Sequence, residues 1–212
     1  GRRRIHYSLC KRRCGLSKTG RIVFSCDRRD LIEKGEKSKM SQLIIIRGNS
    51  GSGKTTVAKA LQHRLGHNVM LLSQDAIRRD LLQVKDGPDT KALPLLCELL
   101  RYGQTHCEVI ILEGILRSDW YAPLFELARE LFPNRILAYY YDLSFEETLA
   151  RHASKENSSE FGAREMREWW QEKDFMDVIP ETVIPARLSK DDTVEMILEE
   201  LSRYAHTQQD ES

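Results

Sequence analysis

Eight residues early in the chain have the types and spacing needed to hold a nucleoside triphosphate. They read Gly48-Asn-Ser-Gly-Ser-Gly-Lys-Thr55 and fit the pattern G-x-x-x-x-G-K-[ST]. Its glycines let the backbone curl, so that successive N–H groups point at phosphate oxygens. Lys54 offers a charge to the β- and γ-phosphates, and the Thr55 hydroxyl is a ligand for Mg²⁺. We therefore expect nucleotide-binding residues at Gly48, Asn49, Ser50, Gly51, Ser52, Gly53, Lys54, Thr55 and Thr56.

The sequence predicts a strand before this loop and a helix after it, which is the setting that a phosphate-binding loop requires. An apolar run at residues 43–46 predicts a buried strand before the loop, and residues 56–65 have a helical pattern after it. The first turn of that helix adds unpaired N–H groups and the positive end of its dipole. A glycine-rich turn that binds nothing is the alternative, and the filled anchor positions favour triphosphate binding.

Asp75 follows the second apolar run, residues 68–73, and is a candidate catalytic base. A carboxylate there, across the cleft from the glycine loop, suits the removal of a proton from an acceptor hydroxyl. Arg78 lies one helical turn further on and shares the face of Asp75, so it is a candidate for substrate binding. The alternative is that Asp75 only caps its own helix.

Glu113 directly follows the third apolar run, residues 108–112. An acidic residue at the end of a strand beside the loop strand is placed to hold Mg²⁺ or its water, and Glu113 alternatively orients the substrate. The nearby Arg117, Asp119 and Trp120 either line an acceptor pocket or are exposed residues at a helix start. We include Trp120 with Asp75, Arg78 and Glu113 among the predicted substrate-binding residues.

Cations that follow the fourth predicted strand are candidates for a closing lid. Arg151 ends a helix, and the polar residues 155–161 lead on to Arg164 and Arg167. Phosphoryl transfer develops charge on the equatorial oxygens, so we predict that Arg151 covers the transferring group and is catalytic with Lys54 and Asp75. The alternative is a solvated cation at a helix C-terminus. Of the adjacent Trp169 and Trp170, we expect one in the core and one free to stack on a planar acceptor.

Strand and helix patterns alternate from Met40 onward. Short apolar runs predict strands at residues 42–47, 68–73, 108–112, 135–141 and 182–184. Helical patterns cover residues 56–65, 75–84, 90–102, 122–131, 144–153, 163–175 and 191–204. Near-continuous apolar strands separated by helices predict an α/β fold with a parallel sheet covered on both faces. Ligands of such sheets bind at the carboxyl ends of the strands, where Asp75 and Glu113 lie.

Charge divides the 212 residues into two parts. Residues 1–39 carry 13 Lys and Arg against 4 Asp and Glu, whereas residues 40–212 carry 20 against 28. We predict a basic leader at 1–39 and one catalytic domain at 40–212. The leader is a nucleic-acid arm, a presequence, or non-native read-through upstream of a natural start at Met40, and we favour the last. A zinc site at His6, Cys10, Cys14 and Cys26 has unfavourable spacing. The odd cysteine count, without a long apolar segment, predicts a cytoplasmic protein.

From residue 42 to about 201, the sequence resembles the small P-loop kinases, which include nucleoside, shikimate, gluconate and chloramphenicol kinases and zeta-toxin-like proteins. It looks most like bacterial uridine-kinase-like proteins of unassigned acceptor. The resemblance rests on the glycine loop, the Asp75-x-x-Arg78 pair, Glu113-Gly114 and the Arg151 region. It implies a five-stranded parallel sheet of order 2-3-1-4-5, a lid at about 154–175, and ATP with Mg²⁺ as donor. It also implies that Asp75 is the base or binds the acceptor hydroxyl, and that Arg187 contacts adenine.

These observations predict a phosphotransferase that moves the γ-phosphate of Mg-ATP to a hydroxyl of a small molecule, such as a nucleoside, sugar, metabolite or antibiotic. One alternative is a kinase of nucleic-acid ends, although an acidic domain argues against a long phosphate-backbone footprint. Another is a non-enzymatic regulatory module that binds ATP. We expect a monomer or homodimer and no membrane partner. The sequence does not identify the acceptor.

Overall fold

The computed structural model describes residues 15–16, 22–23, 41–153, 166–167 and 170–210. Contacts between residues divide the chain into Gly1–Ser38 and Lys39–Ser212. In the first unit, β1 (Gly15–Leu16) pairs antiparallel with β2 (Ile22–Val23). The zinc ligands considered above, and residues 154–165 of the expected lid, lie outside the described residues.

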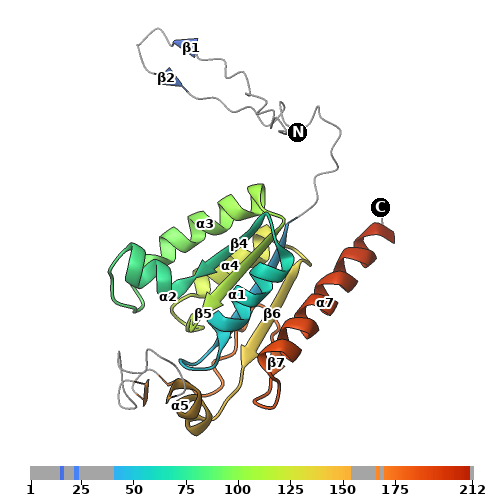
Figure 1. The fold of residues 1–212 in the computed structure, drawn as a ribbon. Coiled ribbons are helices and arrows are strands. Elements are labelled where there is room, and N and C mark those ends of the chain that lie inside the picture. The colour runs from blue at the N-terminus through green and yellow to red at the C-terminus, as the bar shows by residue number, and fades with distance from the viewer. Residues whose placement is uncertain (1–14, 17–21, 24–40, 154–165, 168–169, 211–212) are drawn as a thin grey trace, which may run out of the picture. The chain divides into compact units, whose positions relative to one another are not determined.

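Five parallel strands form the sheet of the second unit (Figure 1). They are β3 (Gln42–Gly48), β4 (Val69–Ser73), β5 (Val109–Gly114), β6 (Ile136–Tyr141) and β7 (Thr182–Ile184). Their spatial order is β4-β5-β3-β6-β7, which is 2-3-1-4-5 when this sheet is counted along the chain. The predicted fold class and strand order are therefore confirmed. The strand that leads into the P-loop, residues 48–55, has a neighbour on each side.

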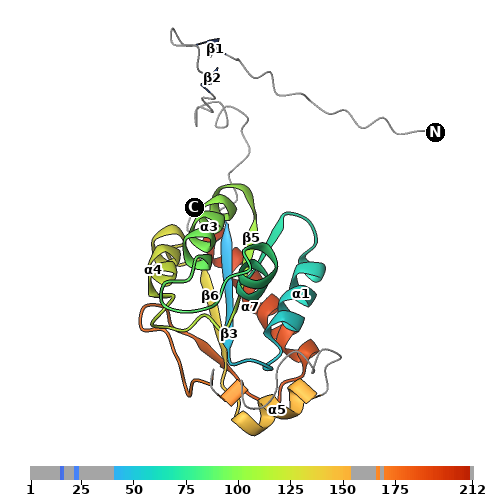
Figure 2. The ribbon, with the colours of Figure 1, turned by 90° about the vertical axis from the view of Figure 1, so that its left-hand side faces the viewer.

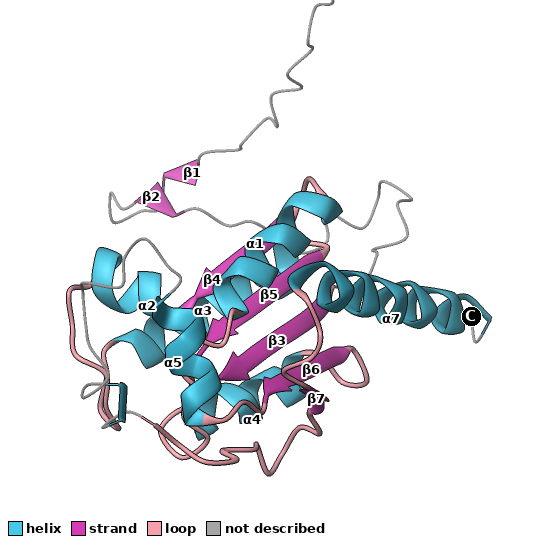
Figure 3. Cartoon of the chain, turned by 60° about the horizontal axis from the view of Figure 1, so that its bottom comes forward, coloured by secondary structure: helices cyan, strands magenta, loops and turns pink. Residues whose placement is uncertain are grey.

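Helices cover both faces of this sheet, as Figure 2 shows edge-on. On one face lie α3 (Ala92–His106) and α4 (Ala122–Leu131), and on the other lie α1 (Lys54–Leu65) and α7 (Lys190–Asp210). Near the carboxyl ends of the strands are α2 (Gln74–Ala76), the π-helix η2 (Ile77–Leu81) and α5 (Phe145–Ala153) (Figure 3). Among the residues that the structure describes, no helix combines the length and the apolar character needed to span a membrane.

The hydrophobic core consists of two clusters, one on each face of the sheet, and successive side chains of β3 belong to alternate clusters. Leu43 and Ile45 pack with residues of α3 and α4, whereas Ile44 and Ile46 pack with residues of α1 and α7. All four side chains are fully buried. Successive side chains of a strand point to opposite faces, so one continuous apolar run can supply both layers. The buried run predicted from the sequence therefore anchors the P-loop on both sides.

Two predicted helices differ from the structure. The helix expected at residues 163–175 is wrong in its second half, because residues 170–175 are not helical and Lys173 has a left-handed φ of 50°. Side-chain contacts hold this segment, as described below. The helix expected at residues 75–84 ends at Leu81, and the Val84 N–H turns back to the carbonyl of Arg78 at 2.9 Å.

Candidate active site

The P-loop requires glycine at two positions for steric reasons. Gly51 has a φ of +81°, and a Cβ there would lie 2.7 Å from the carbonyl oxygen of Thr148. Gly48 has a φ of +138°, and a Cβ there would lie 2.9 Å from that of Tyr141. Both collisions involve a neighbouring strand or helix, not the loop itself. The loop is thus pressed against β6 and α5, and its curvature is fixed by packing.

Lys54 is buried beneath this loop at the start of α1. Its ammonium donates to the carbonyl oxygen of Asn49 at 2.7 Å and to the Ser52 hydroxyl at 3.2 Å. The side chain therefore lies along the inside of the loop, where its charge faces the cradle of backbone N–H groups. This is the place that the sequence pattern predicts for a phosphate-binding lysine.

Glu113 is a buried acid beside the P-loop, and the residue is 1% exposed. Both of its carboxylate oxygens accept from the Thr55 hydroxyl at 3.1 Å, and one also accepts from the Ser73 hydroxyl. Ser73 is the register partner of Glu113 across β4 and β5. Two hydroxyls and a carboxylate are hard oxygen ligands, so these residues fit Mg²⁺. The sequence reasoning missed Ser73, although it ends a strand as Glu113 does.

A cavity of about 540 Å³ joins the P-loop to the residues predicted for the acceptor. The predicted residues Asp75, Arg78, Glu113 and Trp120 all line it. Its full lining is Ser50, Gly51, Gly53, Lys54, Thr55, Gln74, Asp75, Arg78, Arg79, Lys85, Asp86, Glu113, Gly114, Ile115, Arg117 and Trp120. The structure thus brings together side chains from four separate stretches of sequence.

Asp75 lies at the mouth of this cavity with its side chain 55% exposed. Arg78 donates to its Oδ1, and the Nε of Arg79 donates to the same oxygen at 2.9 Å. The helix cap is Ser73, whose hydroxyl accepts from the N–H of Ala76 at 3.5 Å. The capping role considered for Asp75 therefore belongs to Ser73, and the Asp75 carboxylate is oriented by two guanidinium groups.

Gln74, Asp86 and Tyr121 form a hydrogen-bonded triad, of which Gln74 and Asp86 line the cavity. The Gln74 amide donates to Asp86 at 2.8 Å and to the Tyr121 hydroxyl at 2.9 Å, and that hydroxyl donates to Asp86 at 2.7 Å. Burial raises the pKa of Tyr121, and the hydrogen bond to Asp86 raises it further. The phenol therefore stays a donor at neutral pH. No sequence motif marked these three residues, because they come together only through the fold.

Arg117 and Trp120 form one wall of the cavity. The Arg117 guanidinium lies 4.1 Å from the centre of the Trp120 ring and donates to Asp119 at 3.0 and 2.7 Å. That ion pair lowers the pKa of Asp119. Of the three residues that the sequence left open here, Arg117 and Trp120 line the cavity, and Asp119 holds Arg117.

Arg151 and Arg187 do not line the cavity in this structure. The Arg151 guanidinium donates to the carbonyl of Ser52 at 3.1 Å, to that of Ala186 at 2.8 Å and to Glu147 at 2.8 Å. It thus joins the outside of the P-loop to the loop after β7, where Arg187 is exposed. Trp170 packs edge-on against Phe145, with 5.4 Å between ring centres. Arg164 and Trp169 lie outside the described part of the chain.

The remaining predicted nucleotide-binding residues belong to the same loop and helix start. Ser50 faces the cavity, Ser52 is fully buried, and Thr56 is exposed on α1. Asn49 is also buried, and its side chain bonds to the backbone of Gln171 instead of facing the cavity. Roles in nucleotide binding for these residues stay predictions.

Comparison with solved structures identifies proteins with the same fold. A gluconokinase from Sinorhizobium meliloti 1021 has 18% identity and a TM-score of 0.59, with 82% of this chain and 99% of that chain covered. The APS kinase of Mycobacterium tuberculosis has 19% identity and a TM-score of 0.53, with 77% and 98% covered. A shikimate kinase from Acinetobacter baumannii has 17% identity and a TM-score of 0.51, with 78% and 95% covered.

Comparisons of sequence give one family. A search of curated proteins found no match. Residues 43–176 match the AAA domain family, and this segment contains the P-loop, Asp75, Glu113 and Arg151. The chain therefore belongs to the AAA domain family and has the fold of the small P-loop kinases.

Proposed function

We propose that this protein transfers the γ-phosphoryl group of ATP to a hydroxyl of a small molecule. The observation that carries the proposal is the shared cavity, in which the P-loop and Asp75 line one space of about 540 Å³. That volume lies within the range of about 300–1,000 Å³ that is typical of small-molecule sites. A protein that only binds nucleotide has no need of an orientated carboxylate and a second wall of arginine and tryptophan.

The donor end would hold the triphosphate and its metal. The N–H groups of the P-loop and Lys54 would bind the phosphates, and Thr55 and Glu113 would hold Mg²⁺ directly or through water. When bound, the metal supplies positive charge to the β- and γ-phosphate oxygens. Glu113 and Lys54 are both buried. Reduced screening by solvent would strengthen the attraction of Lys54 for the phosphates and of Glu113 for the metal.

The acceptor hydroxyl would react beside Asp75. Its oxygen forms a bond to the γ-phosphorus, the bond from that phosphorus to the β–γ bridging oxygen breaks, and ADP leaves. The hydroxyl proton passes to the Asp75 carboxylate, whose direction is set by Arg78 and Arg79. Arg151 is our candidate for covering the transferring group. It would do so after leaving the carbonyl groups of Ser52 and Ala186.

The excess of cationic side chains at the acceptor end favours the binding of acceptors that carry an anionic group. Four cationic side chains line this end, against the lining carboxylates of Asp75 and Asp86 and the carboxylate of Asp119, which pairs with Arg117. The cations are Arg78, Arg79, Lys85 and Arg117. The planar faces of Arg117 and Trp120 add a surface on which a ring can stack. Hydroxy acids and sugar phosphates therefore belong among the acceptors to be tested, beside nucleosides, sugars and aminoglycosides.

A coupled assay of ADP release over these acceptor classes, with oligonucleotides included, tests the proposal. Turnover that depends on one small hydroxyl compound supports it. Turnover that depends only on oligonucleotide ends indicates a nucleic-acid-end kinase. ATP binding without acceptor-dependent ADP release from any class contradicts the proposal and favours a regulatory module.

The role of Asp75 is tested on the acceptor that this screen identifies. Asp75→Asn keeps the size of the side chain and removes its basicity, and we expect kcat to fall by about 100-fold or more. Asp80→Asn makes the same change at an exposed position of η2 and should leave kcat unchanged. Wild-type turnover by Asp75→Asn would show that Asp75 is not the base.

A further inference from the structure

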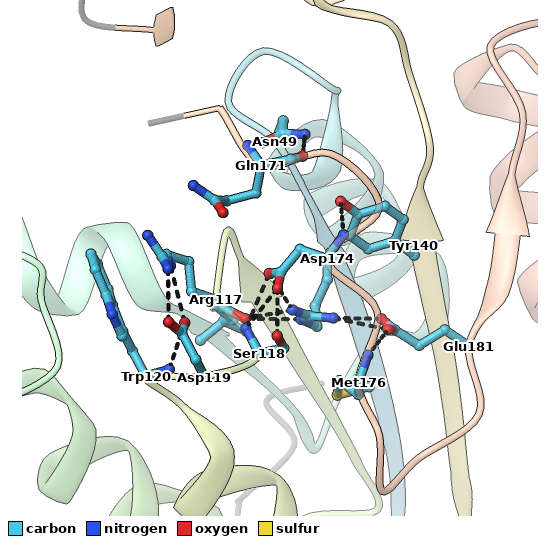
Figure 4. Close-up of polar contacts among 12 residues, drawn as sticks. Asn49, Arg117, Ser118, Asp119, Trp120, Tyr140, Gln171, Asp174, Met176 and Glu181 are labelled. Carbon is cyan, nitrogen blue, oxygen red and sulfur yellow. Dashed lines mark hydrogen bonds and ion pairs between the residues drawn. The ribbon is translucent and has the colours of Figure 1, made fainter. Parts of the chain in front are cut away.

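Arg47 is a fully buried cation at the end of β3, directly before the P-loop. Each of its five N–H groups has an acceptor, and Figure 4 labels two of the residues that accept, Asp174 and Glu181. Two donate to the carbonyl of Leu116 at 3.0 and 2.8 Å, one to Asp174 at 2.9 Å, and two to Glu181 at 3.1 and 2.8 Å. None of these residues lines the cavity. Arg47 therefore fastens two separate segments to the strand that carries the donor loop.

Those segments are the acceptor loop, residues 115–120, and the strap, residues 171–181. They are joined to each other by Asp174, which also accepts from the Ser118 N–H at 3.0 Å and from the Ser118 hydroxyl. Ser118 directly follows Arg117 and lies two residues before Trp120, the two side chains that form the acceptor wall. Asp174 therefore holds the middle of the acceptor loop without touching the cavity.

The other end of the strap is fastened to the donor loop. The Asn49 side chain donates to the Gln171 carbonyl at 2.6 Å and accepts from the Gln171 N–H at 2.9 Å. Such a paired contact fixes both the position and the direction of the strap backbone. Only two residues lie between Gln171 and Asp174, so the chain between the donor loop and the acceptor loop is short (Figure 4).

We propose that Asp174 is a positioning residue, which sets the acceptor wall of Arg117 and Trp120 relative to the donor loop through the strap. The proposal rests on the proposed function for the identity of the two ends of the cavity. A displacement of about 1 Å between reacting groups can lower a rate by about 100-fold. A buried linkage between the loops that hold the two substrates meets that demand.

The competing explanation is that this network only stabilises the fold. Removing one partner of a buried charge pair is destabilising in either case, so stability alone does not separate the two. The readout must report on the acceptor loop itself. Trp120 lies in that loop, and the other two tryptophans of the chain, Trp169 and Trp170, can be replaced by Phe.

The first experiment uses the Trp169→Phe, Trp170→Phe protein as its reference, with Trp120 as the fluorophore. We expect Asp174→Asn and Ser118→Ala to increase acrylamide quenching of Trp120 about twofold. Ser118→Thr keeps the hydroxyl and should restore the reference value. Asp177→Asn, an exposed carboxylate of the same strap, should leave quenching unchanged. Equal quenching in all four variants would overturn the proposal.

Ser118→Ala keeps the experiment decisive if Asp174→Asn does not fold, because it leaves the ion pair between Arg47 and Asp174 in place. Where both variants fold, their double variant should show no more quenching than Asp174→Asn alone, since the two changes remove the same contact. Additive effects would place the two residues in separate contacts and contradict the linkage.

Kinetics with the acceptor from the ADP-release screen give the second readout. We expect Ser118→Ala and Asp174→Asn to lower kcat/KM for the acceptor at least tenfold, with KM for ATP changed less than twofold. A rise in KM for ATP as large as the loss in kcat/KM for the acceptor would indicate a general structural role and overturn the proposal. If the screen finds no acceptor, the proposed function fails, whereas the fluorescence experiment still decides whether Asp174 holds the acceptor loop.

Discussion

The contacts of Glu113 depend on its position near the end of β5. The sequence placed an acid beside the P-loop strand, and the structure gives it two hydroxyl partners in a buried site. Thr55 and Ser73 therefore fix the direction of the Glu113 carboxylate beside the P-loop.

Replacing Glu113 with Gln tests its proposed role in holding Mg²⁺ at constant size. We expect the apparent affinity for Mg²⁺ to fall by about 10- to 100-fold, because an amide offers no charge to the metal. A Mg²⁺ titration of ATP turnover measures it. The same change at Glu130, an exposed residue of α4, is the control. An unaltered Mg²⁺ dependence in Glu113→Gln would remove Glu113 from the metal site.

Residues were predictable where a local pattern marks them. Lys54 and Thr55 belong to a fixed motif, and Asp75 and Glu113 each follow an apolar run. Asp174 was not predictable, because its partners Ser118 and Arg47 are 56 and 127 residues away in sequence. A buried Arg in an otherwise apolar strand was the one available signal for that network. It indicates that carboxylates must lie nearby, but it does not say which.

At the scale of elements, Gly51 and Gly66 have nearly the same φ but different surroundings. Replacing each with Ala therefore distinguishes the cost of backbone strain from the cost of a steric clash. Gly51 has a φ of +81° and a neighbouring carbonyl in the path of a Cβ, whereas Gly66, the C-cap of α1, has a φ of +82° and open space. Gly66→Ala should cost about 1–3 kcal/mol of unfolding free energy from the backbone alone.

Gly51→Ala should cost more than Gly66→Ala and should also abolish ATP binding, since the loop must move away from Thr148 to fit the methyl group. Urea unfolding and calorimetric titration with ATP measure the two effects. Equal costs for the two variants would mean that the P-loop is not pressed against α5.

Ser189 begins the last helix with a reciprocal cap. Its hydroxyl accepts from the Asp192 N–H at 3.1 Å, and its own N–H donates to the Asp192 carboxylate at 3.3 Å. Ser189→Ala should lower the free energy of unfolding by about 1 kcal/mol. Ser202→Ala in the same helix removes a hydroxyl that, among the described residues, bonds back to the carbonyl of Leu198, and it should have a smaller effect. Urea unfolding of both variants is the test, and equal losses would contradict the cap.

Strands were predicted better than helices for a physical reason. The three central strands, β3, β5 and β6, are buried on both faces, and this burial requires a continuous apolar run in the sequence. The segment at 170–175 has helical spacing, yet hydrogen bonds to Asn49, Ser118 and Arg47 hold it in a non-helical conformation. Tertiary hydrogen bonds outweighed a local preference there, and such bonds leave no periodic pattern in the sequence.

For the whole molecule, the alternation of strands and helices predicted a site at the carboxyl ends of the strands, and the family resemblance predicted the strand order. The layered core that results buries four tyrosines, Tyr121, Tyr139, Tyr140 and Tyr141. Burial raises the pKa of each, and a hydrogen bond to Glu200 raises that of Tyr139 further. In the unfolded chain the same phenols ionise near pH 10.

This difference predicts the alkaline limit of stability. Below about pH 10 both states keep these protons, and above it the unfolded state loses them first, so the free energy of unfolding should fall as pH rises. Tyrosinate absorbance of native and urea-unfolded protein, with urea melts across the same range, measures it. Tyr139→Phe should make the fall less steep. Native tyrosines that all titrate near pH 10 would contradict the buried assignment.

The strand order also bears on how the chain matures during synthesis. β3 is made first in the sheet, but its partners are β5 and β6, and β5 is complete only at Gly114. Until then the apolar run Leu43-Ile-Ile-Ile46 has no strand beside it and is open to association with other chains. We infer that nascent chains released before Gly114 are the most aggregation-prone products of this sequence. The central position of β3 holds the P-loop in the finished protein. During synthesis the same position leaves β3 without a partner strand for longer than any other strand of this sheet.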